Sequence, residues 1–174
     1  FLWIYFPSEQ FSCYDLKSAC FVDYTGNGEY MQKYANKIYT SNNDIWLWHD
    51  QNGARKVTYE NEKFKSVTYR VEKGNLPSNK INFITEDKDG IIWIGTGKGL
   101  IRINSESEQL INNKERFNHL INHNGQTYFY TNDNKVLLFD ESASKVIEQT
   151  RLSSNPRITG NLQLKDKWII FTQE

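Results

Sequence analysis

The histidines are the first residues of this sequence to consider for chemistry, because imidazole can act as an acid, a base or a metal ligand near neutral pH. The chain contains three of them, His49, His119 and His123. His119 and His123 are four residues apart, a spacing that would place two zinc ligands on one face of a helix. Turn-forming residues follow Ile121, however, so the spacing loses that meaning. We expect His119 to be half-buried in a strand and His123 to lie in a solvated turn, with a zinc site as the alternative.

An acidic turn is the second group with potential chemistry. Glu86, Asp87 and Asp89 lie just before Gly90, and an Asp-x-Asp-Gly segment offers the oxygen ligands that calcium prefers. The segment lacks the distal glutamate that completes an EF-hand loop. Aspartates in turns also accept hydrogen bonds from the amides of the turn itself. We expect this structural role here, with no metal and no cofactor.

Residues 76–104 supply the elements that must position such groups. They read LPSNKINFITEDKDGIIWIGTGKGLIRIN. Apolar residues alternate at 81–84, and apolar runs follow at 92–96 and 100–103, with turns rich in Asn, Asp and Gly between them. This pattern predicts three short antiparallel strands.

The second strand of this unit recurs along the chain. Aligned on its last residue, the copies end at positions 6, 49, 96, 131 and 172, which are 43, 47, 35 and 41 residues apart. Such an interval is typical of a four-stranded propeller blade. The sequence therefore predicts an all-β fold, a β-propeller fragment of about four blades of four-stranded antiparallel sheets. The predicted repeats are approximately 1–28, 29–75, 76–113, 114–151 and 152–174. A closed ring of seven blades would need roughly 300 residues, so we expect a larger toroid to contain this chain.

The motif within 76–104 resembles a known family. LPSN, an apolar alternation, ED, a turn glycine, IWIGT and GL-x-R together are similar to the two-component regulator propeller repeat. The resemblance implies the periplasmic or extracytoplasmic sensor region of a bacterial hybrid two-component histidine kinase, an inner-membrane protein whose anchor and kinase lie outside this fragment. It also implies a polysaccharide-derived oligosaccharide as the ligand and no enzyme activity in the fragment itself.

Two other functions stay open on the sequence alone. One is a propeller enzyme, such as a polysaccharide lyase or a streptogramin-type lyase, which would use histidines or carboxylates in the central channel. The histidines do not recur on the predicted first strands, and the acidic residues fall mostly in turns, which argues against this alternative. The other is a structural scaffold for protein contacts.

Four of the five tryptophans occupy nearly the same repeat position, which is typical of packing between blades. They are Trp3, Trp46, Trp93 and Trp168. Trp48 differs, because it takes the place of Gly95 and precedes the polar loop at 49–53. We therefore assign structural roles to Trp46, Trp93 and Trp168, and a ligand-contacting role to Trp48.

The loops between second and third strands are the predicted ligand-binding surface. In a propeller these loops open on one face, where they vary without disturbing the blades. An aromatic ring with amides and carboxylates beside it suits a sugar, because the ring stacks on the sugar face and the polar groups bind its hydroxyls. The predicted ligand contacts are Trp48, His49, Asp50, Asn52, Lys98, Asn132 and Asp133.

The overall charge argues against a nucleic-acid partner. The chain has 21 Lys+Arg and 21 Asp+Glu, a formal net charge of zero, and these charges are interspersed. Apolar runs of about five residues are too short for a membrane span or a signal peptide. Incomplete blades at both ends would leave strand edges without partners, which predicts self-association.

Cys13 and Cys20 are the only cysteines and flank a predicted turn at 15–18. A symmetric hairpin would place them opposite each other, close enough for a disulfide. Two reduced cysteines packed in a sheet are the alternative.

Overall fold

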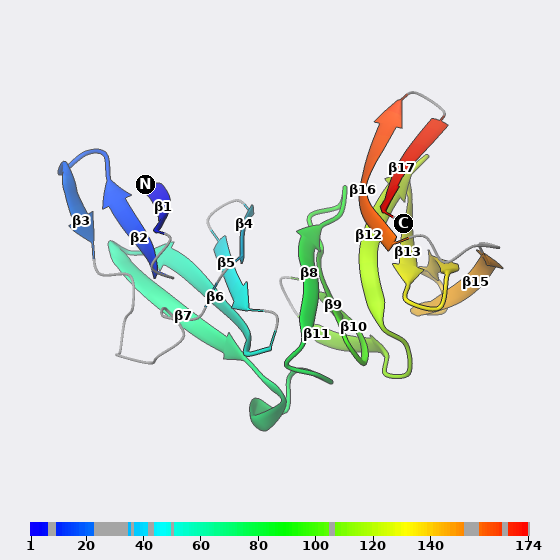
Figure 1. The fold of residues 1–174 in the computed structure, drawn as a ribbon. Coiled ribbons are helices and arrows are strands. Elements are labelled where there is room, and N and C mark those ends of the chain that lie inside the picture. The colour runs from blue at the N-terminus through cyan, green and yellow to red at the C-terminus, as the bar shows by residue number, and fades with distance from the viewer. Residues whose placement is uncertain are drawn as a thin grey trace. The chain divides into compact units, whose positions relative to one another are not determined.

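The computed structural model describes residues 1–6, 10–22, 35, 37–41, 44–49, 51–104, 107–151, 157–164 and 167–173 (Figure 1). For residues 5, 6, 10 and 11 and for the last two strands it describes the backbone alone. Almost all of these residues lie in strands or the turns between them, and η2 (Val71–Lys73) is a single turn of 3-10 helix. In the described ranges no helix has the length and apolar character needed to cross a membrane. The prediction of an all-β chain is confirmed.

The described strands form antiparallel sheets in which each strand pairs with its neighbour in sequence. Three sheets have four strands, one has three and one has two. Every sheet lies within one of the five predicted repeats. The three-stranded sheet contains β1 (Leu2–Phe6), β2 (Gln10–Asp15) and β3 (Cys20–Val22), and the two-stranded sheet contains β16 (Arg157–Leu164) and β17 (Lys167–Gln173). The four-stranded sheets are β4 (Lys37–Ser41), β5 (Asp44–His49), β6 (Gly53–Glu60) and β7 (Lys63–Tyr69); β8 (Ile81–Glu86), β9 (Ile92–Thr96), β10 (Gly99–Ile103) and β11 (Glu108–Asn112); and β12 (Phe117–His123), β13 (Gln126–Thr131), β14 (Lys135–Asp140) and β15 (Lys145–Arg151).

The chain divides into two compact units, residues 1–81 and residues 82–174, and each is described by itself. In the first unit Trp46 is fully buried on β5, and its ring centroid lies 5.1 Å from that of Tyr69. A second cluster, with Leu47 and Val57 at its centre, packs against Trp3 and Phe64. Aromatic and branched residues thus fill the space beside the β4–β7 sheet.

The second unit has a core of large apolar side chains. Trp93 is fully buried, with its ring 4.9 Å from that of Phe129 and 4.8 Å from that of Phe139, both in edge-to-face contacts. Phe117, Leu100 and Leu137 complete the cluster, so that it joins the β8–β11 sheet to the β12–β15 sheet. Trp46 and Trp93 therefore have the burial that their shared repeat position predicts, whereas the side chain of Trp168 lies outside the described part of the chain.

The acidic turn between β8 and β9 has the structural role expected of it. One carboxylate oxygen of Asp87 accepts hydrogen bonds from the amides of Asp89 (2.9 Å) and Ile91 (3.1 Å). The other accepts a bond of 2.7 Å from Nε1 of Trp93. Asp87 is itself buried, so a single carboxylate closes the turn and also satisfies the indole at the centre of the core.

The hairpin of the two cysteines differs from the sequence prediction. Cys13 pairs with Val22, and Cys20 pairs with Asp15, so the thiols are not directly opposed. Both are free, with Cys13 buried and Cys20 exposed. The register follows from the turn at residues 16–19. The Asp15 carboxylate accepts bonds from the amide and hydroxyl of Ser18, and the last residue of the turn, Ala19, has a φ of 55°. The expected opposition of Cys13 and Cys20 was wrong for this reason.

Gly53 gives a testable stability prediction for the first unit. Its φ is +79°, and a Cβ placed on it would overlap the carbonyl oxygen of Tyr69. We expect Gly53→Ala to lower the free energy of unfolding by about 2–3 kcal/mol, from the unfavourable φ together with the clash. Urea denaturation followed by circular dichroism measures the change.

Gly74 is the matched control for this substitution. Its φ is +78°, but no atom lies within 4 Å of the Cβ it would carry. Gly74→Ala should therefore cost only the backbone contribution, about 1 kcal/mol. Equal losses for the two variants would mean that the contact with Tyr69 is absent.

Candidate ligand-binding site

The last residue of the second strand fixes the following loop in all three four-stranded sheets. His49, Thr96 and Thr131 occupy this repeat position, and each accepts a hydrogen bond from a backbone amide two to four residues further along the chain. The bonds are Gln51 N to His49 Nδ1 (3.1 Å), Lys98 N to Thr96 Oγ1 (3.2 Å) and Lys135 N to Thr131 Oγ1 (3.3 Å). His49 thus does what threonine does in the other two sheets, and the loops of the predicted binding face are held by their own side chains.

Trp48, the predicted ligand contact, lies on β5 with little of its indole exposed. Its side chain is only 6% exposed, on a strand where it stands opposite Lys37 and Ala54. The aligned position in the next sheet is Gly95, where a Cβ would overlap the ring of Phe83. An aromatic ring therefore occupies this position in both sheets, supplied by Trp48 itself in one and by the neighbouring strand in the other. Trp48 is nevertheless more exposed than Trp46 and Trp93, which are both 0% exposed, and its contact with a ligand stays a prediction.

The loop after β5 is hydrogen-bonded to residues 70–80, the segment that connects this sheet to the next and that we call the crossing. The carbonyl oxygen of Asn52 accepts a bond of 3.0 Å from Nε of Arg70, and the amide of Gly53 donates to the carbonyl oxygen of Asn79 at 2.9 Å. Asn79 also accepts from the amide of Val71 through Oδ1, at 2.9 Å. These bonds make the loop and the crossing one polar surface. Asp50 lies outside the described residues.

The other predicted contacts lie on loops of the second unit. Lys98 is exposed in the β9–β10 loop, and Asn132 and Asp133 are exposed in the β13–β14 loop. The amide of Asn132 donates a bond of 3.0 Å to the carbonyl oxygen of Arg116. The structure therefore places Trp48, His49 and Asn52 in one unit and these three residues in the other. That all of them contact one ligand stays a prediction.

The histidines of β12 both lie in the strand. His119 is half-buried, as expected, but His123 is the last strand residue, paired with Gln126 and half-buried. The solvated turn predicted for His123 was wrong, because the two-residue turn at Asn124 and Gly125 begins only after it. Over the residues that the structure describes, no group of three His, Cys, Asp or Glu side chains could hold a metal ion.

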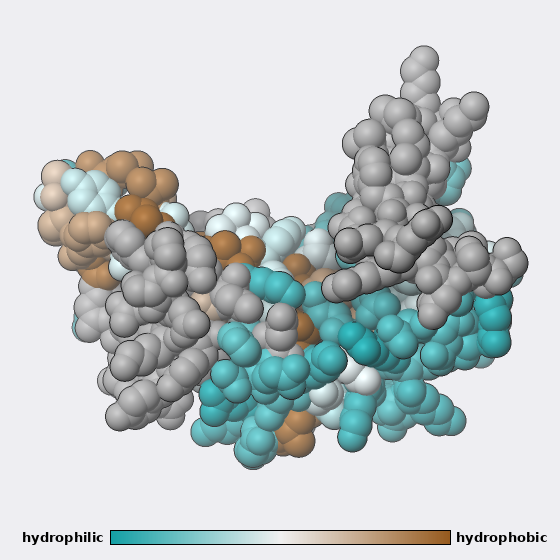
Figure 2. All heavy atoms as spheres, in the orientation of Figure 1, coloured by the Kyte–Doolittle hydropathy of each residue, from teal (hydrophilic) through white to brown (hydrophobic). Residues whose placement is uncertain are grey.

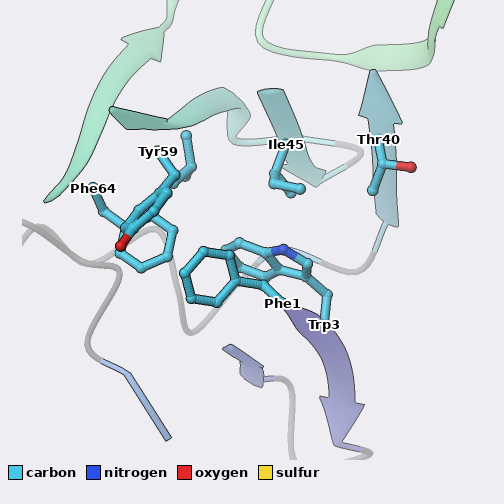
Figure 3. Close-up of a pocket in the computed structure, with 7 residues that line it drawn as sticks. Phe1, Trp3, Thr40, Ile45, Tyr59 and Phe64 are labelled. Atoms are coloured by element: carbon cyan, nitrogen blue, oxygen red, sulfur yellow. The ribbon is translucent and has the colours of Figure 1, made fainter. Parts of the chain in front are cut away.

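The first unit contains an aromatic pocket that the sequence did not indicate. Its volume is about 480 Å³, within the range of small-molecule sites. Figure 3 shows the rings of Phe1 and Trp3 on one side of the pocket and Ile45 across from them, with the rings of Tyr59 and Phe64 at one end. We call this space the aromatic pocket.

Strand register explains why these side chains meet. Tyr59 and Phe64 are directly paired across the β6–β7 hairpin, and their ring centroids are 4.8 Å apart. Thr40, Ile45 and Val57 are paired in turn across β4, β5 and β6. Directly paired residues share one face of a sheet. One face of the β4–β7 sheet therefore forms one side of the aromatic pocket, and the residues of β1 form the other.

A hollow of about 380 Å³ that is lined in part by charged side chains lies in the second unit, between the hairpin ends of its sheets. Its charged groups already have partners: Lys88 Nζ lies 2.7 Å from Asp89, and Glu141 lies 3.2 Å from Arg102. The hydroxyl of Ser142, which donates to Asp140 at 2.7 Å, lowers the pKa of that carboxyl below its ordinary value. These local pairings favour the aromatic pocket as the binding site.

Comparison with known proteins agrees with the resemblance in the sequence. Residues 75–98 match the family described as "Two component regulator propeller". No curated protein matches the chain.

Solved structures show the same fold over almost the whole chain. The extracellular domain of the hybrid two component system BT3049 from B. thetaiotaomicron has a TM-score of 0.65 at 17% identity, over 98% of this chain and 23% of its own. That of BT4673 from B. thetaiotaomicron has a TM-score of 0.66 at 14% identity, over 94% of this chain and 22% of its own. Apo AztD from Citrobacter koseri has a TM-score of 0.56 at 17% identity, over 93% of this chain and 50% of its own.

This chain therefore spans about a quarter of the length of the two extracellular domains. Its three four-stranded sheets and its likeness to these domains show a β-propeller fragment.

Proposed function

We propose that this chain is the propeller portion of the extracellular sensor of a hybrid two-component histidine kinase, and that its ligand is a neutral oligosaccharide derived from a polysaccharide. The match of residues 75–98 to the two component regulator propeller family carries this proposal. Two of the solved structures that share the fold are extracellular domains of hybrid two component systems, which supports a periplasmic or extracellular location. The membrane anchor and the kinase belong to other parts of the parent protein.

The geometry of the chain supports binding by a preformed surface. The loops at the ends of β5, β9 and β13 are held by their own side chains, as the bonds of His49, Thr96 and Thr131 show. The described residues that line the aromatic pocket offer rings and hydroxyl groups and carry no charged side chain. A site that is already formed loses little conformational entropy on binding, which suits a sensor that must respond to a soluble sugar.

A glycan array tests this function and separates it from a lyase. The chain is applied to immobilised oligosaccharides from plant, microbial and host polysaccharides, and the same glycans in solution are followed for the ultraviolet absorbance of unsaturated products. We expect binding to a small structurally related set of glycans, and no absorbance change. Product formation would instead establish the lyase, and a chain that binds no glycan at all would overturn the proposed ligand class.

We also propose that the isolated chain self-associates through the β1–β3 sheet. Figure 2 shows hydrophobic surface over this sheet, where Phe1, Leu2, Leu16 and Phe21 are exposed. Among the described strands β1 pairs only with β2, so it is the first strand of this sheet. A contiguous apolar surface of this kind favours contact with another chain.

Sedimentation at micromolar concentrations measures this association. We expect a weight-average mass that rises with concentration, and we expect Leu16→Lys together with Phe21→Lys to reduce it, because two charges would then lie in the contact. Val67→Lys, on the exposed face of β7, is the control. A monomer at all concentrations would contradict the proposal.

A further inference from the structure

We infer that the aromatic pocket binds one pyranose ring of a neutral sugar, and that a neighbouring hollow holds the adjoining ring. This inference rests on the proposed function for its ligand class, and it goes further by naming the site. The neighbouring hollow has a volume of about 320 Å³ and shares Phe1, Tyr59 and Phe64 with the aromatic pocket. The two spaces thus lie on either side of one aromatic wall.

The shared wall is fixed before any ligand arrives. The ring of Phe1 meets that of Tyr59 edge to face, with centroids 4.6 Å apart, and lies 5.3 Å from that of Phe64. Tyr59 and Phe64 sit on either side of the turn at Asn61 and Glu62, whose φ values of 50° and 62° are those of a tight two-residue hairpin turn. The hairpin register therefore determines how far apart these two rings lie.

The ring surface of this wall is accessible. Phe1 is 46% exposed and Tyr59 is 36% exposed, although both are large aromatic side chains. Exposed aromatic faces bind the C–H faces of a sugar ring, because those faces are apolar while the hydroxyls point outward around the ring. Burial of these rings by a sugar would remove apolar area from water on both partners.

The charges around the two spaces select a neutral ligand with hydroxyl groups. The side chains of described residues that line the aromatic pocket are all uncharged, so an ionised sugar would find no oppositely charged side chain among them to offset its lost hydration. Asp15, Glu62 and Lys63 line only the neighbouring hollow, where they can accept bonds from hydroxyls and donate to them. The hydroxyl of Ser18 and the amide of Lys17 lower the pKa of Asp15, and this carboxylate stays ionised near neutral pH.

The indole resonances of the chain report directly on this site. Five tryptophans give five Nε1–H signals in a 15N-labelled sample, and Trp3→Phe identifies the one in the aromatic pocket. The probes are cellobiose, maltose, lactose and xylobiose as neutral disaccharides, with digalacturonic acid as the charged comparison. We expect at least one neutral disaccharide to shift the Trp3 signal saturably while the Trp93 signal, from the buried core of the other unit, stays in place.

Substitutions then show whether the aromatic wall makes the site. Tyr59→Ala should weaken the binding of that disaccharide at least tenfold, and Tyr59→Phe, which keeps the ring, should weaken it less than threefold. Phe21→Ala removes an exposed ring that lines neither space, and it should leave binding unchanged. The melting temperature of each variant shows that it is folded.

Three results would overturn the inference. The first is that no disaccharide shifts the Trp3 signal. If the chain still binds oligosaccharides elsewhere, only the site assignment fails, and the proposed function stands. The second is undiminished binding by a folded Tyr59→Ala variant. The third is a Trp3 signal that moves with protein concentration and not with sugar, because a second copy of the chain would then fill the aromatic pocket.

Discussion

Replacing Trp93 with alanine should lower the free energy of unfolding by about 3–5 kcal/mol, the range for emptying a large buried aromatic site. Trp93 is fully buried and packs edge to face against Phe129 and Phe139. Its loss would leave a cavity between two sheets of the second unit and remove contacts from both. Urea denaturation monitored by circular dichroism measures the change.

Trp93→Phe separates packing from hydrogen bonding at this position. Phenylalanine keeps most of the ring contact but removes the Nε1–H group that donates to Asp87 at 2.7 Å. Trp46 makes a suitable comparison, because it is equally buried and its Nε1 has no hydrogen-bond partner among the described residues. We expect Trp93→Phe to cost more than Trp46→Phe by about 1–2 kcal/mol. An alanine variant of Trp93 that loses less than about 1 kcal/mol would contradict the packing described here.

Replacing Asp87 with alanine should have the second-largest effect, a loss of about 3–4 kcal/mol. Three donors would lose their acceptor: the amides of Asp89 and Ile91 and the indole of Trp93. Hydrogen bonds to charged groups contribute about 1.5–3 kcal/mol each, and a buried donor without a partner adds its desolvation penalty. The effects overlap, so their sum is an upper limit.

Asp87→Asn and Asp89→Ala are the controls for this prediction. Asparagine keeps one carbonyl oxygen for the turn amides, and its cost should be about half that of alanine. The carboxylate of Asp89 is exposed, and the bonds it makes in this turn are to the neighbouring Lys88. Asp89→Ala keeps the backbone amide that donates to Asp87 and should change stability by less than about 0.5 kcal/mol. Equal losses for Asp87→Ala and Asp89→Ala would show that the turn is not organised by Asp87.

The strands could be predicted from the sequence because their signals are local. The predicted strand at 92–96 is β9 with the same bounds, and the acidic turn before it forms the amide bonds expected of aspartate in a turn. The hairpin at Cys13 and Cys20 shows the limit of such reasoning. There the register depends on which amides the Asp15 carboxylate binds, and residue spacing alone does not determine that choice.

The candidate site depended on information that residue patterns do not contain. Trp48 precedes a polar loop and yet is buried, because the direction of its indole is set by the space beside the sheet. The aromatic pocket joins Phe1 and Trp3 of one sheet to Tyr59 and Phe64 of another. Each of these aromatic residues fits an ordinary strand when considered alone. Only the packing of the β1–β3 sheet against the β4–β7 sheet brings them around one space.

Calorimetric titration of the 174-residue chain with soluble neutral oligosaccharides from the glycan-array hits tests the central claim most directly. A sensor portion should give saturable binding at one site, and the sugar should be recovered unchanged after the titration. Saturable heat with an unaltered sugar is therefore the predicted result. Absence of saturable heat with every neutral oligosaccharide at millimolar concentration, or conversion of the sugar into a product, would contradict it.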